Sequence, residues 1–325
     1  MKTKLLTALL IGSSVFTSAS SFATYSNPGH IELGLTGGGF RSMNENNPYG
    51  ILANAVANPP SGTALDADSS HEFGGAVSLG YRFAESPYTL GIVYWGADND
   101  KTKSASGIIG LTKAPANFSI DFAQDANSRL DYKNDFVNIF LNATYHPDEH
   151  LVFVPKVGVS YLKVRNDQHT TYSGLQVTAN TIVQVDEQSK FSGWGPSIGA
   201  DLDYHLVSGL SVFGNLLYNA IIGDIDSRYQ AFQTTVAGNN TDVISKSDST
   251  IVNYIQSEIG LSYLFLPCKT YTGNIMLGWA LSKAFGSTQN KAAFTDDVGD
   301  SQFASDITNT GYHGPFVRLA FTYDV

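Results

Sequence analysis

The chain has 325 residues and a formal net charge of −10, and it combines 31 Gly, 17 Tyr and 19 Phe with only 15% charged residues and a single cysteine. An acidic balance argues against nucleic acid as a partner, and one cysteine excludes an internal disulfide bond. In soluble domains about a quarter of the residues are charged. The low charge content of this chain, together with its many Gly, Tyr and Phe residues, favours either a large exported β-sandwich or a membrane β-barrel.

The first residues have the pattern of a secretory signal peptide. Lys2 and Lys4 precede an apolar run, Leu5–Phe16, that is too short to cross a bilayer, and small residues follow at the end of the leader. We therefore expect residues 1–23 to be cleaved and residues 24–325 to form a single domain. Loss of the two lysines leaves 17 basic and 29 acidic residues, a formal charge of −12. No later run approaches the length of a membrane helix.

Apolar residues alternate with small or polar ones along the rest of the chain, at the period of two that is typical of β-strands. In the last segment, for example, Val317, Leu319 and Phe321 alternate with Arg318 and Ala320. Each such segment is expected to be a strand with one apolar face. The ten segments are residues 30–40, 73–83, 88–95, 136–145, 151–164, 194–204, 210–222, 251–265, 271–282 and 314–325.

The connections between these segments alternate in length. Short ones lie at about 85–87, 146–150, 206–209 and 266–270, and long polar ones at about 42–70, 100–129, 166–189, 230–249 and 287–310. A sandwich has no reason to sort its loops in this way, whereas an even strand number with short periplasmic turns and long extracellular loops is typical of outer-membrane barrels. The sequence therefore predicts an all-β, antiparallel transmembrane β-barrel of about ten strands, within a range of about 8 to 14.

Aromatic residues on the apolar faces gather near the short connections and the C-terminus. We expect them to form a girdle at the periplasmic membrane–water boundary, because their rings have an apolar body and, in Tyr, a polar tip. The residues are Phe83, Tyr88, Tyr145, Phe153, Tyr204, Tyr263, Phe265, Tyr271 and Tyr323.

The pattern of the last strand indicates what the barrel would contact. Lipid would cover its apolar face, and pairing with the first strand would remove its free edge. A C-terminal strand of this kind resembles the signal that outer-membrane assembly machinery reads. Outer-membrane lipid and lipopolysaccharide, this machinery and a second copy in a homo-oligomer are the expected partners, and nucleic acid is not.

The opposite, inward faces carry the ionisable residues, because a charge facing lipid costs a few kcal/mol. By parity these are Glu32, Arg82, Lys156, Asp201, Asp203, Glu258 and Arg318. The pore-lining candidates among them are Arg82, Lys156, Asp201, Glu258 and Arg318. Such groups either set the selectivity of a pore, here weakly cationic, or pair with one another and plug the lumen. Large inward side chains favour a narrow lumen, since ten strands enclose little more space than eight; they are Phe136, Phe140, Phe213, Leu217 and Met276.

Other motifs have simpler interpretations. "GLTGGGF" (34–40) lacks the Lys of a phosphate loop, and "DNDKTK" (98–103) and "DDVGDSQFASD" (296–306) lack the spacing of a calcium-binding hand, so we interpret the last two as solvated loops. Outer-membrane proteases use paired Asp groups and an Asp–His couple, for which His169, Asp224, Asp226, Asp98 and Asp100 are the available residues. None lies in a matching pattern. We expect no catalytic residues, no metal, no cofactor and no enzymatic activity.

Several segments resemble the Legionella-type major outer-membrane protein family of pore-forming barrels, namely residues 193–230 and 311–325, with weaker support from residues 71–83. The resemblance implies a Gram-negative outer-membrane protein with porin-like activity. Pattern and resemblance together predict an integral outer-membrane barrel that acts as a passive diffusion channel for small solutes or ions. The alternative is a closed barrel that works through its surface loops as an adhesin or an envelope-structural protein.

Overall fold

The computed structural model describes residues 29–44, 48–53, 62–66, 71–113, 122–174, 181–235, 238–267, 270–295 and 301–325. The expected signal peptide and Cys268 lie outside these residues. In the described part of the chain, no helix is long and apolar enough to cross a bilayer.

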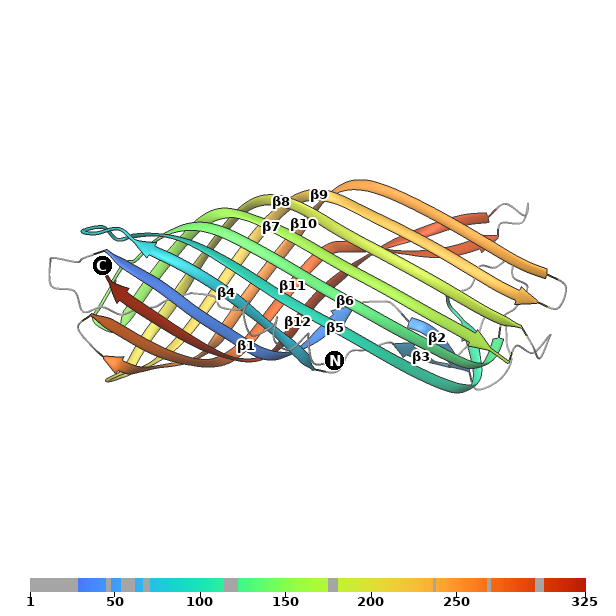
Figure 1. Cartoon of the computed structure of the whole chain (residues 1–325), viewed down its shortest axis with the longest axis horizontal. Coiled ribbons are helices and arrows are strands. Elements are labelled where there is room, and N and C mark those ends of the chain that lie inside the picture. The colour runs from blue at the N-terminus through green and yellow to red at the C-terminus, as the bar shows by residue number, and fades with distance from the viewer. Residues whose placement is uncertain are drawn as a thin grey trace.

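Ten long strands form one closed antiparallel barrel (Figure 1). They are β1 (His30–Asn44), β4 (Glu72–Arg82), β5 (Tyr88–Leu111), β6 (Phe122–Ala143), β7 (Leu151–Ser173), β8 (Ile182–Val207), β9 (Leu210–Thr235), β10 (Gly238–Pro267), β11 (Tyr271–Thr295) and β12 (Ser301–Asp324). β1 pairs with both β4 and β12, and β5 pairs with β6, so the ten strands close into a ring. This confirms the predicted fold class, strand number and closure by the last strand.

A short hairpin adds to the ten strands at the end opposite the short turns. It consists of β2 (Pro48–Ala53) and β3 (Gly62–Asp66), and β2 pairs with the last residues of β5. The sequence did not predict it, because it lies in the segment 42–70 that was expected to be a loop.

The strands extend much further than the alternation predicted. β10 spans 30 residues, and it pairs with β9 from Tyr263 opposite Leu210 up to Gly238 opposite Thr235. Most of the expected loop 230–249 is therefore paired strand, and residues 98–103, interpreted as a solvated loop, lie within β5. The backbone ladder continues where the outward face has become polar, so the outward hydrophobic pattern stops before the strand does.

The short connections are where they were expected. β4 ends at Arg82 and β5 begins at Tyr88, while β8 ends at Val207 and β9 begins at Leu210. Gly209 has a φ of +79°, a conformation that glycine adopts without a steric penalty, which allows the tight reversal between β8 and β9.

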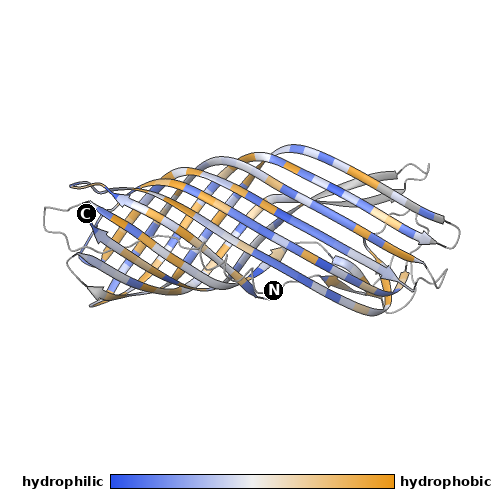
Figure 2. Ribbon diagram, in the orientation of Figure 1, coloured by the Kyte–Doolittle hydropathy of each residue, from blue (hydrophilic) through white to orange (hydrophobic). Residues whose placement is uncertain are grey.

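An apolar band surrounds the half of the barrel that carries the short turns, where Figure 2 shows the orange residues at their densest. On β7 the outward positions from Leu151 to Tyr161 are apolar, and Val157 and Val159 are 56% and 51% exposed. Ten steps of about 3.3 Å, tilted by about 40°, rise about 25 Å, the height of the apolar band of an outer-membrane barrel. The predicted aromatic girdle faces outward at the short-turn rim, as Tyr145, Tyr204 and Tyr271 illustrate.

Opposite walls of the barrel meet at the other end. The pairing of β10 with β11 ends at Asn253 opposite Phe285, and β11 shifts register between Ala284 and Thr288. Beyond this irregularity the backbone N–H of Gln289 donates to the Oγ of Ser189 on β8, over 3.0 Å. The upper part of β11 has therefore left its neighbour in the wall and lies across the lumen.

Candidate functional site: the barrel interior

Four of the five pore-lining candidates come together in one layer inside the apolar band. The Nζ of Lys156 on β7 lies 2.5 Å from a carboxylate oxygen of Asp201 on β8. An Nη of Arg318 on β12 donates to both carboxylate oxygens of Glu258 on β10, over 2.8 and 2.7 Å. Lys156 and Arg318 are 2% and 0% exposed. We call these four side chains the charged layer.

Further contacts fix the charged layer in place. The Nε of Arg318 donates to the Oγ1 of Thr36 over 2.9 Å, and its guanidinium lies 5.0 Å from the ring centre of Phe316. The Nδ2 of Asn215 donates to Glu258 over 2.8 Å. A buried ion pair needs such additional hydrogen bonds, because its mutual attraction alone hardly offsets the loss of hydration.

Arg82, the fifth candidate, lies apart from the charged layer. Its Nε donates to the backbone oxygen of Ser86 in the short turn after β4, over 3.2 Å. It is buried and points inward, as expected, but its contact ties down a periplasmic turn. The two remaining inward acids also lie in local pairs, Glu32 with His30 and Asp203 with His205.

A layer of aromatic rings fills the lumen next to the charged layer. Trp95 on β5 and Tyr312 on β12 stack with their ring centres 3.8 Å apart, and Phe40 meets both edge-on. Phe136 on β6 meets Tyr254 on β10 from the opposite wall, at 5.0 Å. We call this the aromatic layer. The five large inward residues predicted from parity, Phe136, Phe140, Phe213, Leu217 and Met276, are all at most 5% exposed.

The cavity between the two layers is very small. Its lining includes Trp95, Phe136, Leu217 and Glu258, and its volume is about 10 Å³. A cavity needs about 10 to 15 Å³ to hold one water molecule, so this space has room for one at most.

A third group of buried side chains, the mouth group, lies at the extracellular end of the barrel. The Nζ of Lys113, just after β5, lies 2.6 Å from the carboxylate of Glu187 on β8, and both side chains are nearly buried. Tyr229 donates to the backbone oxygen of Lys113 over 2.6 Å, and Tyr172 donates to that of Tyr49 in β2. Burial raises the pKa of the Tyr172 phenol. Sequence reasoning missed this mouth group, because its residues lie in segments that were expected to be loops; inward apolar residues such as Val183 and Val185 were the available signal.

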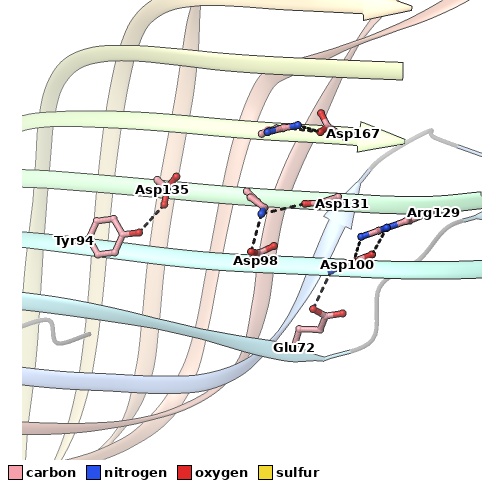
Figure 3. Close-up of polar contacts among 10 residues, drawn as sticks. Glu72, Tyr94, Asp98, Asp100, Arg129, Asp131, Asp135 and Asp167 are labelled. Atoms are coloured by element: carbon pink, nitrogen blue, oxygen red, sulfur yellow. Dashed lines mark hydrogen bonds and ion pairs between the residues drawn. The ribbon is translucent and has the colours of Figure 1, made fainter. Parts of the chain in front are cut away.

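The residues weighed for a protease-like site lie on the outside of the barrel. Asp98 and Asp100 on β5 pair with Lys133 and Arg129 of β6 (Figure 3). His169 on β7 lies 2.5 Å from Asp186 of β8, a partner that the sequence did not indicate.

Asp224 and Asp226, on β9, are not brought to His169; they accept hydrogen bonds from Ser249 and Ser247 of β10. Among the described residues, no three His, Cys, Asp or Glu side chains are grouped so as to hold a metal ion. These five acids, counting Asp186, are thus distributed over three strands and paired with neighbours.

Comparison with known families decides the classification. The family model described as Legionella pneumophila major outer membrane protein precursor matches residues 39–323, nearly the whole chain. The chain belongs to this family. It is therefore a protein of the Gram-negative outer membrane, in agreement with the apolar band and the closed barrel. No curated protein sequence matches the chain.

Solved structures of similar proteins are distant. The outer membrane protease OmpT from Escherichia coli is 10% identical, with 94% of this chain and all of that chain covered and a TM-score of 0.40. A major outer membrane protein from Thermus thermophilus is 11% identical, covers 88% of this chain and 98% of its own, and has a TM-score of 0.29. A Pseudomonas aeruginosa FadL homologue is 7% identical, with coverages of 91% and 90% and a TM-score of 0.27. Likenesses at this level do not bear on activity.

Proposed function

We propose that this outer-membrane barrel is closed at rest and serves as an envelope-structural protein that acts through its outer wall and its extracellular surface. The observation that carries the proposal is the filling of the lumen at three successive levels: the charged layer, the aromatic layer and the mouth group. A small hydrated ion needs a continuous wet path, and the cavity between the first two layers admits one water molecule.

The outer wall of the barrel offers a surface for contacts with other components of the envelope. β5 to β12 continue past the apolar band as paired strands, so the part of the wall beyond the membrane is a rigid sheet. Ion pairs across neighbouring strands, such as Arg129 with Asp100, cover it (Figure 3). Such a surface suits binding to envelope components better than it suits catalysis.

A narrow ion channel that opens from this closed state is the second candidate. This candidate keeps the passive diffusion channel that was predicted from the sequence. The charged layer is the feature of the structure that supports it. Ion pairs and hydrogen bonds, unlike a packed apolar plug, exchange for water when a charge is neutralised or displaced, and ionised side chains in a membrane protein commonly mark an ion path.

Conductance across a planar bilayer separates the two candidates. The wild-type barrel is expected to be silent at moderate voltage. The double variant Arg318→Ser/Glu258→Ser removes the larger ion pair of the charged layer, and Arg129→Ser/Asp100→Ser removes an exposed pair on the outer wall as a matched control.

Absence of conductance in all three proteins supports the closed structural barrel. Brief discrete openings of the wild type that lengthen in Arg318→Ser/Glu258→Ser, and not in the control, support the gated channel instead. Steady conductance steps of the unmodified barrel would overturn the closed state altogether.

A further inference from the structure

A groove of about 550 Å³ lies on the outside of the barrel across β7 to β10. Its walls include four cations and two carboxylates on the outward face: Lys163, Arg165, Lys190, Arg228, Asp167 and Asp226. We call it the outer-wall groove. The groove thus has a local excess of positive charge, although the formal net charge of the chain is −10.

The strand register brings like charges together in the outer-wall groove. Arg165 on β7 is the direct partner of Lys190 on β8, and Lys163 lies one outward position below Arg165. Like charges directly opposite each other in a sheet are destabilising. Asp167 relieves part of this, since it accepts a hydrogen bond of 2.7 Å from the Nε of Arg165 and raises the pKa of that guanidinium.

The charges of the other three cations are not taken up by ion pairs within the described residues, although Asp226 on β9 is the register partner of Lys190. Within the described part of the chain, the ammonium groups of Lys163 and Lys190 form no ion pair with a carboxylate. Asp135, opposite Lys163 on β6, accepts instead from the hydroxyl of Tyr94 over 2.7 Å. Arg228 donates to the side-chain oxygen of Gln230 over 3.3 Å and, in the same part of the chain, to no carboxylate.

The groove lies directly beyond the apolar band. Tyr161 and Trp194, whose ring centres are 4.8 Å apart, are the last outward residues of the apolar band on β7 and β8, and Trp194 is 56% exposed. Lys163 is one outward position past Tyr161 and Lys190 is two past Trp194. One outward position is about 6.6 Å along a strand, so the cations lie within about 7 to 13 Å of the edge of the hydrocarbon. That is the headgroup layer of the outer leaflet.

We propose that the outer-wall groove binds the phosphate groups of a phosphorylated glycolipid of the outer leaflet, lipopolysaccharide, whose acyl chains lie against Tyr161 and Trp194. Lysine offers a phosphate a compact charge and arginine offers it two parallel N–H donors. A bound phosphate removes the repulsion between Arg165 and Lys190. This assignment is independent of whether the lumen conducts.

The test measures binding of purified diphosphorylated lipid A to the folded full-length barrel in detergent, with the change in intrinsic tryptophan fluorescence, to which the exposed Trp194 contributes, as the readout. The groove variant is Lys163→Gln/Lys190→Gln/Arg228→Gln. The matched control is Arg41→Gln/Arg129→Gln/Lys283→Gln, which removes three outward cations away from the groove. All samples contain EDTA, so that divalent cations cannot bridge lipid phosphates to Asp167 or Asp226. Heat-modifiability on gels confirms folding of each variant.

The groove variant is expected to bind lipid A at least about tenfold more weakly than the wild type, because each charge-assisted contact to phosphate is among the stronger hydrogen bonds in proteins. The control should stay within about twofold, and dephosphorylated lipid A should bind the wild type as weakly as lipid A binds the groove variant. Equal binding of lipid A to wild type and groove variant would overturn the proposal. So would competition by inorganic phosphate at millimolar concentration, which would identify a site for free anions.

Discussion

Arg318 provides a quantitative test of the sealed lumen. Its guanidinium is fully buried and binds both carboxylate oxygens of Glu258, while Thr36 and Asn215 add one hydrogen bond each to the pair. Removing one partner of a buried pair costs about 3 to 5 kcal/mol, because a charge is left unpaired away from water. In a wide, wet pore the same pair would be worth at most about 1 kcal/mol.

A double-mutant cycle measures the difference. The variants are Arg318→Met, Glu258→Gln and the two combined, unfolded by urea in lipid vesicles and followed by tryptophan fluorescence. Arg318→Met should cost about 3 to 5 kcal/mol, and the combined variant should cost less than Arg318→Met alone because no charge is stranded. Arg129→Met, which breaks the exposed pair with Asp100, should leave the free energy of unfolding almost unchanged. A loss below about 1 kcal/mol for Arg318→Met, or additive effects in the cycle, would refute the sealed lumen.

Two further predictions concern the wall. A Cβ added at Gly195 would lie 1.8 Å from the backbone oxygen of Ala220, whereas the nearest atom to one added at Gly214 is 3.8 Å away. Gly195→Ala should therefore destabilise the barrel by more than about 2 kcal/mol and Gly214→Ala should leave it unchanged or slightly more stable, as urea midpoints will show; equal midpoints would contradict the strand contact. The hydrogen bond from Lys133 to Asp98 raises the pKa of this ammonium group on the outer wall. Its contribution to stability should be fully present below the ordinary lysine pKa of about 10.4 and disappear as the pH rises through the raised value. The difference in unfolding free energy between wild type and Lys133→Met should thus be less than about 1 kcal/mol at about pH 8 and close to zero at about pH 12, and a difference that persists at high pH would show that the ion pair is not its source.

Much of the barrel could be predicted from the sequence because lipid imposes a strict alternation. Val157 and Val159 must face hydrocarbon, so Lys156 and Ser160 must face inward, and parity alone placed the charged layer inside. The predicted inward residues Phe136 and Phe140 also indicated correctly that the lumen is narrow.

The extracellular half could not be predicted in the same way, because water on the outside imposes no alternation. Polar runs such as residues 230–249 look like loops, although hydrogen bonds between β9 and β10 continue through them. The inward bend of β11 brings the backbone of Gln289 to Ser189, which is 100 residues away in the sequence. The residues around Gln289 carry no sequence signal for a backbone contact with a side chain so far away in the chain.

Parity also leaves the pairing of charges undetermined. The sequence placed Arg82 and Arg318 on the same inward surface, but only the structure shows that Arg318 binds Glu258 while Arg82 holds a turn. The outer-wall groove was missed for a related reason. Lys163, Lys190 and Arg228 are scattered in the sequence, and the strand register brings them together.

Accessibility of single cysteines along β7 tests the central claim most directly, namely that lipid surrounds the outside of a barrel whose inside is sealed. In a Cys268→Ser background, a single cysteine replaces Val157, Val159 or Ser160. The cysteines at 157 and 159 carry a small fluorophore, and the cysteine at 160 remains free. Labels at the two valine positions should be quenched by nitroxide lipids, and a free cysteine at 160 should react with no small water-soluble thiol reagent in the folded barrel. Rapid reaction at position 160, or absence of lipid quenching at 157 and 159, would contradict the claim.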